Sequence, residues 1–299
     1  MIIITPTAGM CNRMRALDSA LALGQAASTP VRAIWRLCPD LNCRFERLFE
    51  PLPGLESIEY REERRPAPSE NAASLRLSLK KIAPLVLTIK CARRAKKTFR
   101  NFDPRSRVIE QIDTGRMLAN PERLVEQARR FDLYIDTFDR FFYGRVDFED
   151  FRPIPALMQR IDAFHLKQRS VVGVHVRRTD HLPAYDHSPT SAFIQVMEAE
   201  IERDPAVEFF LSTDTPEIET QLDVRFPGKI LRQTEKVFGR DLPEGIEDAV
   251  VDLFCLASCR KVVGTCKSSF SETAASIHKI PLEVIDVIAR PAGKPTGAV

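Results

Sequence analysis

The sequence predicts an α/β protein with two domains, each built on a mostly parallel sheet. The length of 299 residues leaves room for one large domain or two of ordinary size. Apolar strands alternate with helical patterns, and continuously apolar strands of this kind indicate a parallel sheet covered on both faces. Hydrophobic residues make up 44% and charged residues 28%, which is the composition of a folded, soluble globular protein.

The first half of the chain predicts a βαβ unit. Its opening apolar run ends at Pro6, and a turn that contains Gly9 leads into apolar residues at helical spacing. A later stretch that is charged and carries two prolines predicts an exposed loop. In chain order we expect a strand at 2–5, a helix at 12–27, a strand at 31–35, an exposed loop at 61–71, a helix at 124–130 and a strand at 133–137.

The second half shows the alternation of strands and helices more clearly. Pro153 and Pro155 interrupt regular structure, so we place the domain boundary there and expect domains at 1–152 and 153–299. Strands are expected at 170–176, 207–211, 229–231, 261–263 and 282–285. Helices are expected at 155–167, 190–203, 216–226, 247–258 and 269–278.

A strongly basic segment covers residues 76–107, which we expect to be a helical insert in the first domain. It carries eleven Lys and Arg against one acid, Asp103, so the rest of the chain has a net charge of −7 while the whole has +3. Such a segment suits an anionic acceptor, a phospholipid surface or RNA, or is simply a solvated face. Because the overall charge is mild, we expect no nucleic-acid partner.

The chain shows none of the sequence features of a membrane-spanning or exported protein. Its most apolar stretch, 82–89, is far shorter than the roughly 20 apolar residues that a transmembrane helix needs. The N-terminus has no basic leader, so we expect a cytoplasmic, reducing environment. Seven cysteines, without C-x-x-C or paired Cys/His spacing, predict neither disulfides nor a zinc site. Cys255 and Cys259 are interpreted as small buried residues.

Four polar segments lie at the carboxyl ends of predicted strands, where open parallel sheets bind their ligands. In the first, HVRRTD at 175–180, strand alternation places His175 and Arg177 on one side and Arg178 on the other. The planar donor fork of arginine suits a phosphate. We therefore assign a phosphate to Arg177 and an internal ion pair, for instance with Asp180, to Arg178.

The other three segments also contain donors and acceptors for a ligand. In LSTDTPE, Asp214 either caps the next helix or, if Thr215 is the cap, accepts from a base edge such as that of guanine. Residues 264–271, GTCKSSFS, carry four hydroxyl groups in seven positions before a predicted helix, which is a ready anion site. The segment after the first strand matches neither the dinucleotide fingerprint nor the Walker A motif, which disfavours nicotinamide and nucleoside-triphosphate chemistry.

Together these segments resemble a fucosyltransferase superfamily. HVRRTD looks like the hallmark motif of the enzymes that form α1,6 and α1,2 linkages, of nodulation-factor fucosyltransferases and of protein O-fucosyltransferases. GMCNRMRAL resembles their G-x-G-N-x-x-R-A-L loop, with Cys11 at a position where glycine is usual. LSTDTPE and DLFCLASCRKVVGTCKSSFSETAA resemble the later blocks, and the order and spacing of all four agree, whereas residues 50–120 match none.

The resemblance implies a GT-B fold, in which two Rossmann-like domains face each other across a cleft. It also implies that residues 153–299 bind most of GDP-fucose and that transfer inverts the anomeric carbon without a metal; the chain contains no D-x-D pair of the kind that metal-dependent transferases use. Arg177 is then the catalytic group that stabilises charge on the β-phosphate. The other donor-binding residues that the resemblance implies are Gly9, Asn12, Arg13, His175, Asp214, Ser268, Ser269 and Phe270.

The resemblance leaves the general base open. The lysine and the glutamate that follow R-R-T-D in the α1,6 enzymes are replaced here by His181 and Tyr185, so Asp186 is our candidate base and His181 the alternative. We expect a GDP-sugar donor, no further cofactor, an oligosaccharide or glycolipid acceptor and peripheral contact with the inner membrane face. The alternatives are a GT-B transferase for another nucleotide sugar, a non-catalytic nucleotide-sugar-binding protein, and a protein that binds RNA or acidic lipid through its basic segment.

Overall fold

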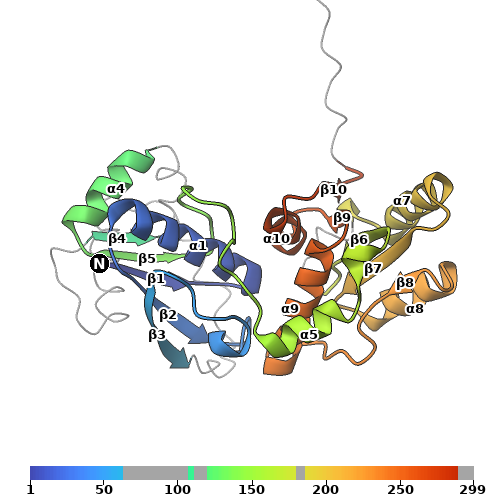
Figure 1. Ribbon diagram of the computed structural model, residues 1–299, viewed down its shortest axis with the longest axis horizontal. Helices are drawn as coiled ribbons and strands as arrows, with labels where there is room; N and C mark the ends of the chain where they lie inside the picture. Colours follow the sequence, from blue (N-terminus) through green and yellow to red (C-terminus); the bar gives the residue numbers. More distant parts are fainter. Residues whose placement is uncertain (63–106, 111–119, 180–185, 289–299) are drawn as a thin grey trace, which may run out of the picture. The chain divides into compact units, whose positions relative to one another are not determined.

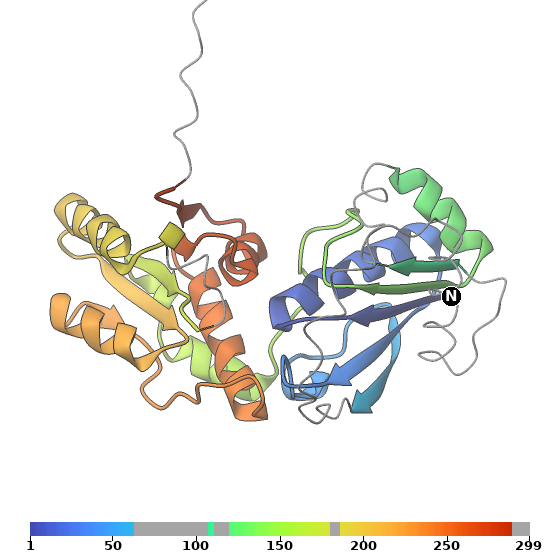
Figure 2. The same ribbon diagram turned by 180° about the vertical axis from the view of Figure 1, so that it is seen from behind.

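The computed structural model describes residues 1–62, 107–110, 120–179 and 186–288 (Figures 1 and 2). The chain divides into two compact units. The first contains Met1–Arg152 and the short segment Arg240–Pro243, and the second contains Pro153–Gly239 and Glu244–Val299. The division between Arg152 and Pro153 falls where two prolines, one residue apart, interrupt regular structure.

The first unit is built on a five-stranded parallel sheet with the order β3-β2-β1-β5-β4. The connections β1–α1–β2 and β4–α4–β5 run in the same direction across the sheet, so right-handed crossovers place both helices on one face. Figure 1 shows α1 and α4 beside each other there. The elements are β1 (Ile2–Pro6), α1 (Met10–Ala27), β2 (Val31–Leu37), η1 (Phe45–Arg47), β3 (Leu55–Glu62), β4 (Arg107–Glu110), α4 (Pro121–Arg130) and β5 (Leu133–Thr137).

The second unit is built on another five-stranded parallel sheet, with the order β10-β9-β6-β7-β8. Its connections run in both directions from the centre, so α7 and α8 cover one face while α9 and α10 cover the other (Figures 1 and 2). The elements are α5 (Pro155–Asp162), η3 (Leu166–Gln168), β6 (Val171–Val176), α7 (Thr190–Arg203), β7 (Glu208–Thr213), α8 (Pro216–Arg225), β8 (Ile230–Leu231), α9 (Pro243–Ala257), β9 (Lys261–Thr265), α10 (Ser269–Ile277) and β10 (Leu282–Ile285).

The central strand β6 is buried along its whole length and alternates between the two faces. Gly173 faces α9, because a Cβ atom there would lie 2.8 Å from Cδ2 of Leu256. Val172, Val174 and Val176 face the other way and join an apolar cluster with α7 and α8. That cluster contains Val172, Val174, Val176, Phe193, Met197, Val207, Phe209, Leu211, Ile218, Leu222, Phe226, Val263 and Ile285.

The structure confirms the predicted α/β class, while several elements begin or end elsewhere than expected; α9, for example, begins at Pro243 instead of residue 247. The strand β3 was not predicted and includes residues 61 and 62, which were expected to begin a loop; as an edge strand it keeps mostly polar, partly exposed side chains. The helix expected at 155–167 ends at Asp162, because His165 is left-handed with φ 50° and a 3₁₀ turn follows. Arg107 begins the unpredicted strand β4.

The remainder of the basic segment 76–107 lies outside the described residues, as do residues 63–71 of the expected loop. Among the helices that the structure describes, none is long and apolar enough to cross a membrane.

Candidate active site

The strands β6 and β9 lie side by side where the strand order of the second sheet reverses. From β6 the chain passes through α7 to β7, and from β9 it passes through α10 to β10 on the opposite side. In an open parallel sheet, ligands bind at the carboxyl ends of two such strands because the loops that follow them diverge. These ends carry HVRRTD and the turn 264–271, and LSTDTPE follows the neighbouring strand β7, so the fold brings three of the four predicted segments together.

The hydroxyl group of Thr265 joins the two strand ends. Its Oγ1 atom donates a hydrogen bond to the carbonyl oxygen of His175 and accepts one from the N–H group of Arg177, both over 3.0 Å. The backbone of Arg177 is therefore fixed directly after the last residue of β6, and its side chain is half-buried. This arrangement places a guanidinium group at the edge of the sheet where a ligand is expected.

The turn after β9 has the donors of an anion site. Lys267 adopts a left-handed conformation with φ 56°, and Ser268 follows as the N-cap of α10. Ser268 is 1% exposed, and its Oγ atom has no hydrogen-bond partner among the described residues. A buried hydroxyl group normally has a partner. Because the first N–H groups of a helix also lack intrahelical acceptors, an anion at this point would satisfy both.

His175 is held against α10 by two contacts. Its Nδ1 atom lies 2.8 Å from Oγ of Ser271, and its ring stacks on Phe270 with centroids 4.8 Å apart and planes at 28°. His175 itself is 6% exposed, while Phe270 is half-buried. The structure thus places His175 and Phe270 together beside the turn 264–271, on the face of the sheet that α10 covers. Their contact with a nucleotide stays a prediction.

Arg178 points to the opposite face of the sheet and braces the chain, as expected. The buried guanidinium donates to the carbonyl oxygens of Arg177 and Ser188, each over 2.9 Å, and to Oγ1 of Thr190 over 3.0 Å. Its centre also lies 6.0 Å from the ring centroid of Phe193 on α7. The partners are therefore carbonyl groups and a threonine, whereas the expected partner at 180 lies outside the described residues.

Asp214 supports the same loop from β7. Its carboxylate accepts hydrogen bonds from the N–H group of Arg178 over 2.7 Å and from both the N–H and the hydroxyl group of Thr179, over 3.1 and 2.7 Å. The sequence left open whether Asp214 or Thr215 caps the next helix. Thr215 is the N-cap residue of α8, but its side chain makes no capping hydrogen bond. Asp214 thus positions the residues after Arg177, and a guanine contact by its carboxylate stays a prediction.

In the first unit, the guanidinium of Arg13 is buried and forms hydrogen bonds within the protein. It is 1% exposed and donates from Nε to the carbonyl oxygen of Ala8 over 2.8 Å, from Nη1 to that of Arg36 over 2.6 Å and from Nη2 to Sγ of Cys38 over 3.1 Å. Its guanidinium also lies over Trp35, 4.9 Å from the ring centroid, and burial lowers the pKa of Arg13. These contacts give Arg13 a bracing role in the loop between β1 and α1.

Gly9 ends the loop between β1 and α1, and Asn12 lies in the first turn of α1. Gly9 is the N-cap residue of α1, and a Cβ atom there would lie 3.8 Å from Nη1 of Arg240. Asn12 accepts a hydrogen bond from the guanidinium of Arg15. Arg240 belongs to the segment that joins the first unit, where Asn42 donates to its carbonyl oxygen over 3.1 Å. No sequence pattern indicated Arg240, which is separated from Gly9 by most of the chain.

The candidate base Asp186 is exposed, and it precedes His187, whose Nδ1 atom lies 2.7 Å from Oδ1 of Asp286. The alternative base at 181 lies outside the described residues. The structure therefore shows that Asp186 is accessible to solvent, and its role as a base stays a prediction.

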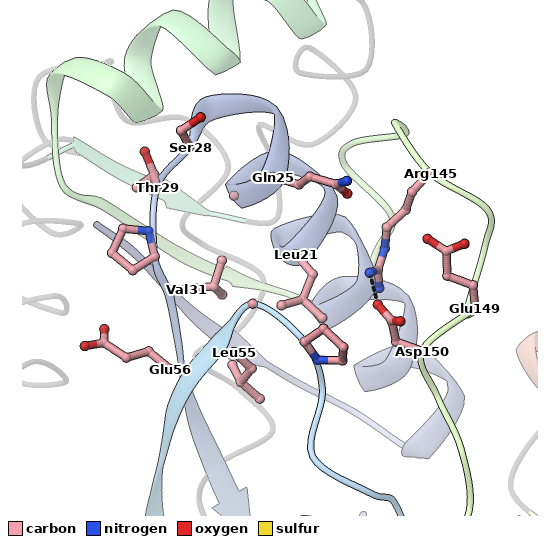
Figure 3. Close-up of a pocket in the computed structure, with 14 residues that line it drawn as sticks. Leu21, Gln25, Ser28, Thr29, Val31, Leu55, Glu56, Arg145, Glu149 and Asp150 are labelled. Carbon is pink, nitrogen blue, oxygen red and sulfur yellow. Dashed lines mark hydrogen bonds and ion pairs between the residues drawn. The ribbon is translucent and has the colours of Figure 1, made fainter.

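A hollow in the first unit lies at the other edge of its sheet, at the amino ends of β2 and β3 (Figure 3). Its volume is about 760 Å³, and Arg145, which lines it, pairs with Asp150 and with the buried Asp18. None of the sequence-predicted site residues lines this hollow. Because parallel sheets bind ligands at the carboxyl ends of their strands, we do not assign it to the active site.

Comparison with solved structures identifies the fold. The chain matches NodZ alpha-1,6-fucosyltransferase soaked with GDP-fucose over 92% of both chains, with a TM-score of 0.58 and 20% identity. It matches POFUT1 in complex with GDP over 95% of this chain and 98% of that one, with a TM-score of 0.53 and 11% identity. A mutant of Arabidopsis thaliana FUT1 in complex with GDP matches over 97% and 70%, with a TM-score of 0.55 and 11% identity.

The chain has the fold of the GT-B fucosyltransferases. A scan against protein-family models finds no match, and a comparison with curated proteins finds none either. At identities of 20% and below, the likeness of these GT-B structures extends to the fold alone.

Within the second unit of this GT-B chain, the carboxyl ends of β6 and β9 bring together His175, Arg177, Ser268 and Phe270, and Ser269 begins α10 beside them. Thr265 was not singled out from the sequence, although it belongs to the hydroxyl-rich turn that drew attention. Ser271 was likewise part of that turn without an assigned partner. Both were identified only when the pairing of β6 with β9 was known.

Proposed function

We propose that this protein is a glycosyltransferase that moves fucose from GDP-fucose to a hydroxyl group of a glycan acceptor. The observation that carries the proposal is that the backbone of Arg177 is hydrogen-bonded to Thr265, three residues before Ser268, the N-cap of α10, whose buried hydroxyl group has no partner among the described residues. Solved structures of the same fold were obtained with GDP-fucose or GDP, which supports a GDP-sugar as the donor. The HVRRTD resemblance supports fucose as the sugar.

The turn 264–271 supplies neutral donors for the diphosphate of this substrate. Ser268 offers a buried hydroxyl group and Ser269 a second one at the first position of α10. The N–H groups of the first turn add the partial positive charge of a helix N-terminus. Glu272 lies in the first turn of α10, and its side chain is exposed to solvent. We assign the phosphate groups to this turn and to Arg177.

Breaking the bond between fucose and phosphate creates two developing charges. The β-phosphate oxygen gains negative charge while the anomeric carbon becomes cationic, so fixed donors beside that oxygen lower the barrier. We assign this task to Arg177, since its backbone is fixed by Thr265 and its guanidinium carries a full charge. A donor in such a position contributes roughly 3 kcal/mol to transition-state stability.

We further propose a single displacement that inverts the anomeric carbon, with no metal at the diphosphate. The acceptor oxygen forms a bond to the anomeric carbon while the bond to the β-phosphate oxygen breaks and GDP leaves. The proton of the acceptor hydroxyl passes to a base, for which the exposed carboxylate of Asp186 is the candidate. An oligosaccharide or glycolipid acceptor, used in the cytoplasm, completes the proposal.

Release of GDP from GDP-fucose in the presence of pooled oligosaccharide acceptors tests this function. The unmodified chain should release GDP in an acceptor-dependent manner, and Arg177→Ala should lower that rate by about 10²–10³-fold. Equal rates for both proteins would refute the role of Arg177. Tight binding of GDP-fucose without turnover in any acceptor pool would instead favour a non-catalytic nucleotide-sugar-binding protein.

A further inference from the structure

His187, Cys266 and Asp286 form a cluster of metal-ligating groups beside the site already described. Nδ1 of His187 lies 2.7 Å from Oδ1 of Asp286, and Sγ of Cys266 lies 3.1 Å from Oδ2 of the same carboxylate. One ligand atom from each of the three residues lies within 4.8 Å of the other two. The cluster therefore offers a nitrogen, a sulfur and an oxygen ligand around one point.

The fold holds these three residues in place through their backbones. Cys266 follows β9 and Asp286 follows β10, two strands that pair with each other, while His187 precedes α7. The N–H group of Cys266 donates to Oγ of Ser188 over 2.9 Å, and that of Val287 donates to the carbonyl oxygen of His187 over 2.8 Å. The ligands are thus brought together by contacts that do not involve the ligand atoms, which is the pre-organisation that a metal site needs.

A nucleophilic role for Cys266 does not agree with this arrangement. A cysteine nucleophile is activated by a base that accepts its proton, usually a histidine oriented by a carboxylate. Here the carboxylate of Asp286 lies between the thiol and the imidazole. Burial raises the pKa of the Cys266 thiol, and the hydrogen bond and charge of Asp286 raise it further, which disfavours the thiolate that a nucleophile needs.

We propose that His187, Cys266 and Asp286 bind one divalent cation of the zinc class, with water as the fourth ligand. Sulfur, imidazole and carboxylate ligands are the set that zinc takes in tetrahedral geometry. Tetrahedral ligands around zinc lie roughly 3.3–3.7 Å apart, so the two hydrogen-bonded pairs must separate by about 0.5–1 Å. Binding replaces the Cys266 proton, which leaves for solvent, and the thiolate and carboxylate together neutralise the ion.

The ion can reach this cluster from solvent. The side chains of His187 and Asp286 are 24% and 23% exposed, whereas Cys266 is buried at the inner end. Lys267 is the nearby positive charge that opposes a cation, and Glu272 is a nearby negative charge that favours one. The bound ion would tie the segment that begins at Asp186 to the ends of β9 and β10, and Cys266 belongs to the same turn, 264–271, to which we assign the diphosphate.

Cobalt provides a direct probe of such a site in the full-length protein. After dialysis against a chelator, Co²⁺ should bind with a stoichiometry of one per chain and give a sulfur-to-cobalt charge-transfer band together with the visible bands of four-coordinate cobalt. Zn²⁺ should displace it and protect Cys266 from alkylation, as located by mass spectrometry. Absence of the charge-transfer band in the unmodified protein, or protection of other cysteines instead, would overturn the proposal without any variant.

Matched variants assign the ligands. Cys266→Ser should abolish the charge-transfer band, and His187→Gln should weaken Zn²⁺ binding by at least about tenfold, the lower end of the effect of losing an outer partner. Cys259→Ser and His278→Gln remove a cysteine and a histidine elsewhere in the same unit. These two variants should leave the charge-transfer band and the affinity for Zn²⁺ unchanged. An unaltered band in Cys266→Ser would contradict the assignment. Titration of the same samples with GDP tests the proposed donor site separately.

Discussion

Arg177 and Arg178 are neighbours in the chain, yet their surroundings predict opposite roles. Arg177 is half-buried beside the hydroxyl-rich turn, and Thr265 fixes its backbone. Arg178 is 5% exposed and donates hydrogen bonds to two carbonyl oxygens and to Oγ1 of Thr190. Both residues directly follow β6, and the alternation of an extended chain predicts that their side chains point to opposite faces. We therefore predict that the Arg177 guanidinium binds the ligand, whereas that of Arg178 stabilises the fold.

Substitution of each arginine by alanine should separate these roles. Arg178→Ala removes the charged donor from two carbonyl groups, so we expect it to lower the free energy of unfolding by about 2–4 kcal/mol. Arg177→Ala should change that free energy by less than ~1 kcal/mol while it abolishes most GDP release. Urea unfolding and the GDP-release assay measure the two effects. A larger loss of stability in Arg177→Ala than in Arg178→Ala would reverse the assignment.

Helix α10 packs on β9 at very short range, and this contact positions the turn that precedes it. A Cβ atom on Gly264 would lie 2.4 Å from both Cβ and Oγ of Ser271, the residue that contacts His175. The Cβ atom of Ser271 cannot move aside without the helix, and rotation of its Oγ atom would break the contact with His175. Only glycine therefore allows α10 to place its N-terminus at the carboxyl end of β9.

Gly264→Ala should displace α10, lower the free energy of unfolding by about 1–3 kcal/mol and weaken GDP binding, because overpacking moves the helix N-terminus. Gly173→Ala is the matched control, because its new Cβ would meet the tip of the flexible Leu256 side chain at 2.8 Å. Calorimetric titration with GDP compares the two variants. Equal GDP affinities for both would show that the position of α10 does not control donor binding.

Glu200 connects α7 to β9 through a buried carboxylate. Its side chain is 2% exposed and pairs with Lys261 over 2.9 Å, and also with Arg260 and Arg203. Burial alone would raise the pKa of Glu200, but the hydrogen bond and charge of Lys261 and the charges of both arginines outweigh it, so the pKa is lowered. A group with a lowered pKa stabilises the fold above its unfolded pKa, and this stabilisation is lost as the pH falls through the folded value.

Glu200→Gln should therefore reduce the free energy of unfolding by about 1–3 kcal/mol at neutral pH. The difference from the unmodified protein should shrink as the pH falls below about 4, where the unfolded glutamate becomes protonated. Glu198→Gln, which breaks only the exposed pair with Arg225, should cost less than ~0.5 kcal/mol at either pH. Urea unfolding at both pH values measures this, and a pH-independent deficit in Glu200→Gln would exclude the carboxylate charge as the cause.

The order of strands and helices in the second unit could be predicted because each element has one clear period. The apolar run of β6 and the helical spacing of α7 were both visible in the sequence. The strand β3 was missed, since an edge strand with partly exposed, charged side chains has neither an apolar run nor strict alternation. The end of α5 was missed because the left-handed turn at His165 has no glycine to mark it.

The candidate site could be predicted in part. Segments at strand ends were recognisable, and so was the division of Arg177 from Arg178 by alternation. The sequence did not indicate that Arg13 donates to backbone carbonyl groups. It also did not indicate the cluster of His187, Cys266 and Asp286. Both depend on which strands become neighbours, and the three residues of the cluster come from segments that are far apart in sequence.

For the molecule as a whole, donor selectivity is the property that the proposed function must explain. A ligand that binds only the folded state raises the melting temperature by an amount that grows with the logarithm of its concentration divided by its Kd. GDP-, UDP-, ADP- and CDP-sugars share the diphosphate, so Arg177 and the turn at α10 should bind part of each of them. Differences in melting temperature among the four ligand classes therefore reflect how the protein binds the base and the sugar.

The decisive measurement is the melting temperature of the full-length protein with each of these four classes of nucleotide sugar at equal concentration. We predict that GDP-fucose gives the largest increase, roughly 5 °C or more at a concentration about 100-fold above its Kd, and that Arg177→Ala loses most of it. A larger increase with a UDP-, ADP- or CDP-sugar, or an equal increase in Arg177→Ala, would contradict a GDP-fucose donor site at the carboxyl ends of β6 and β9.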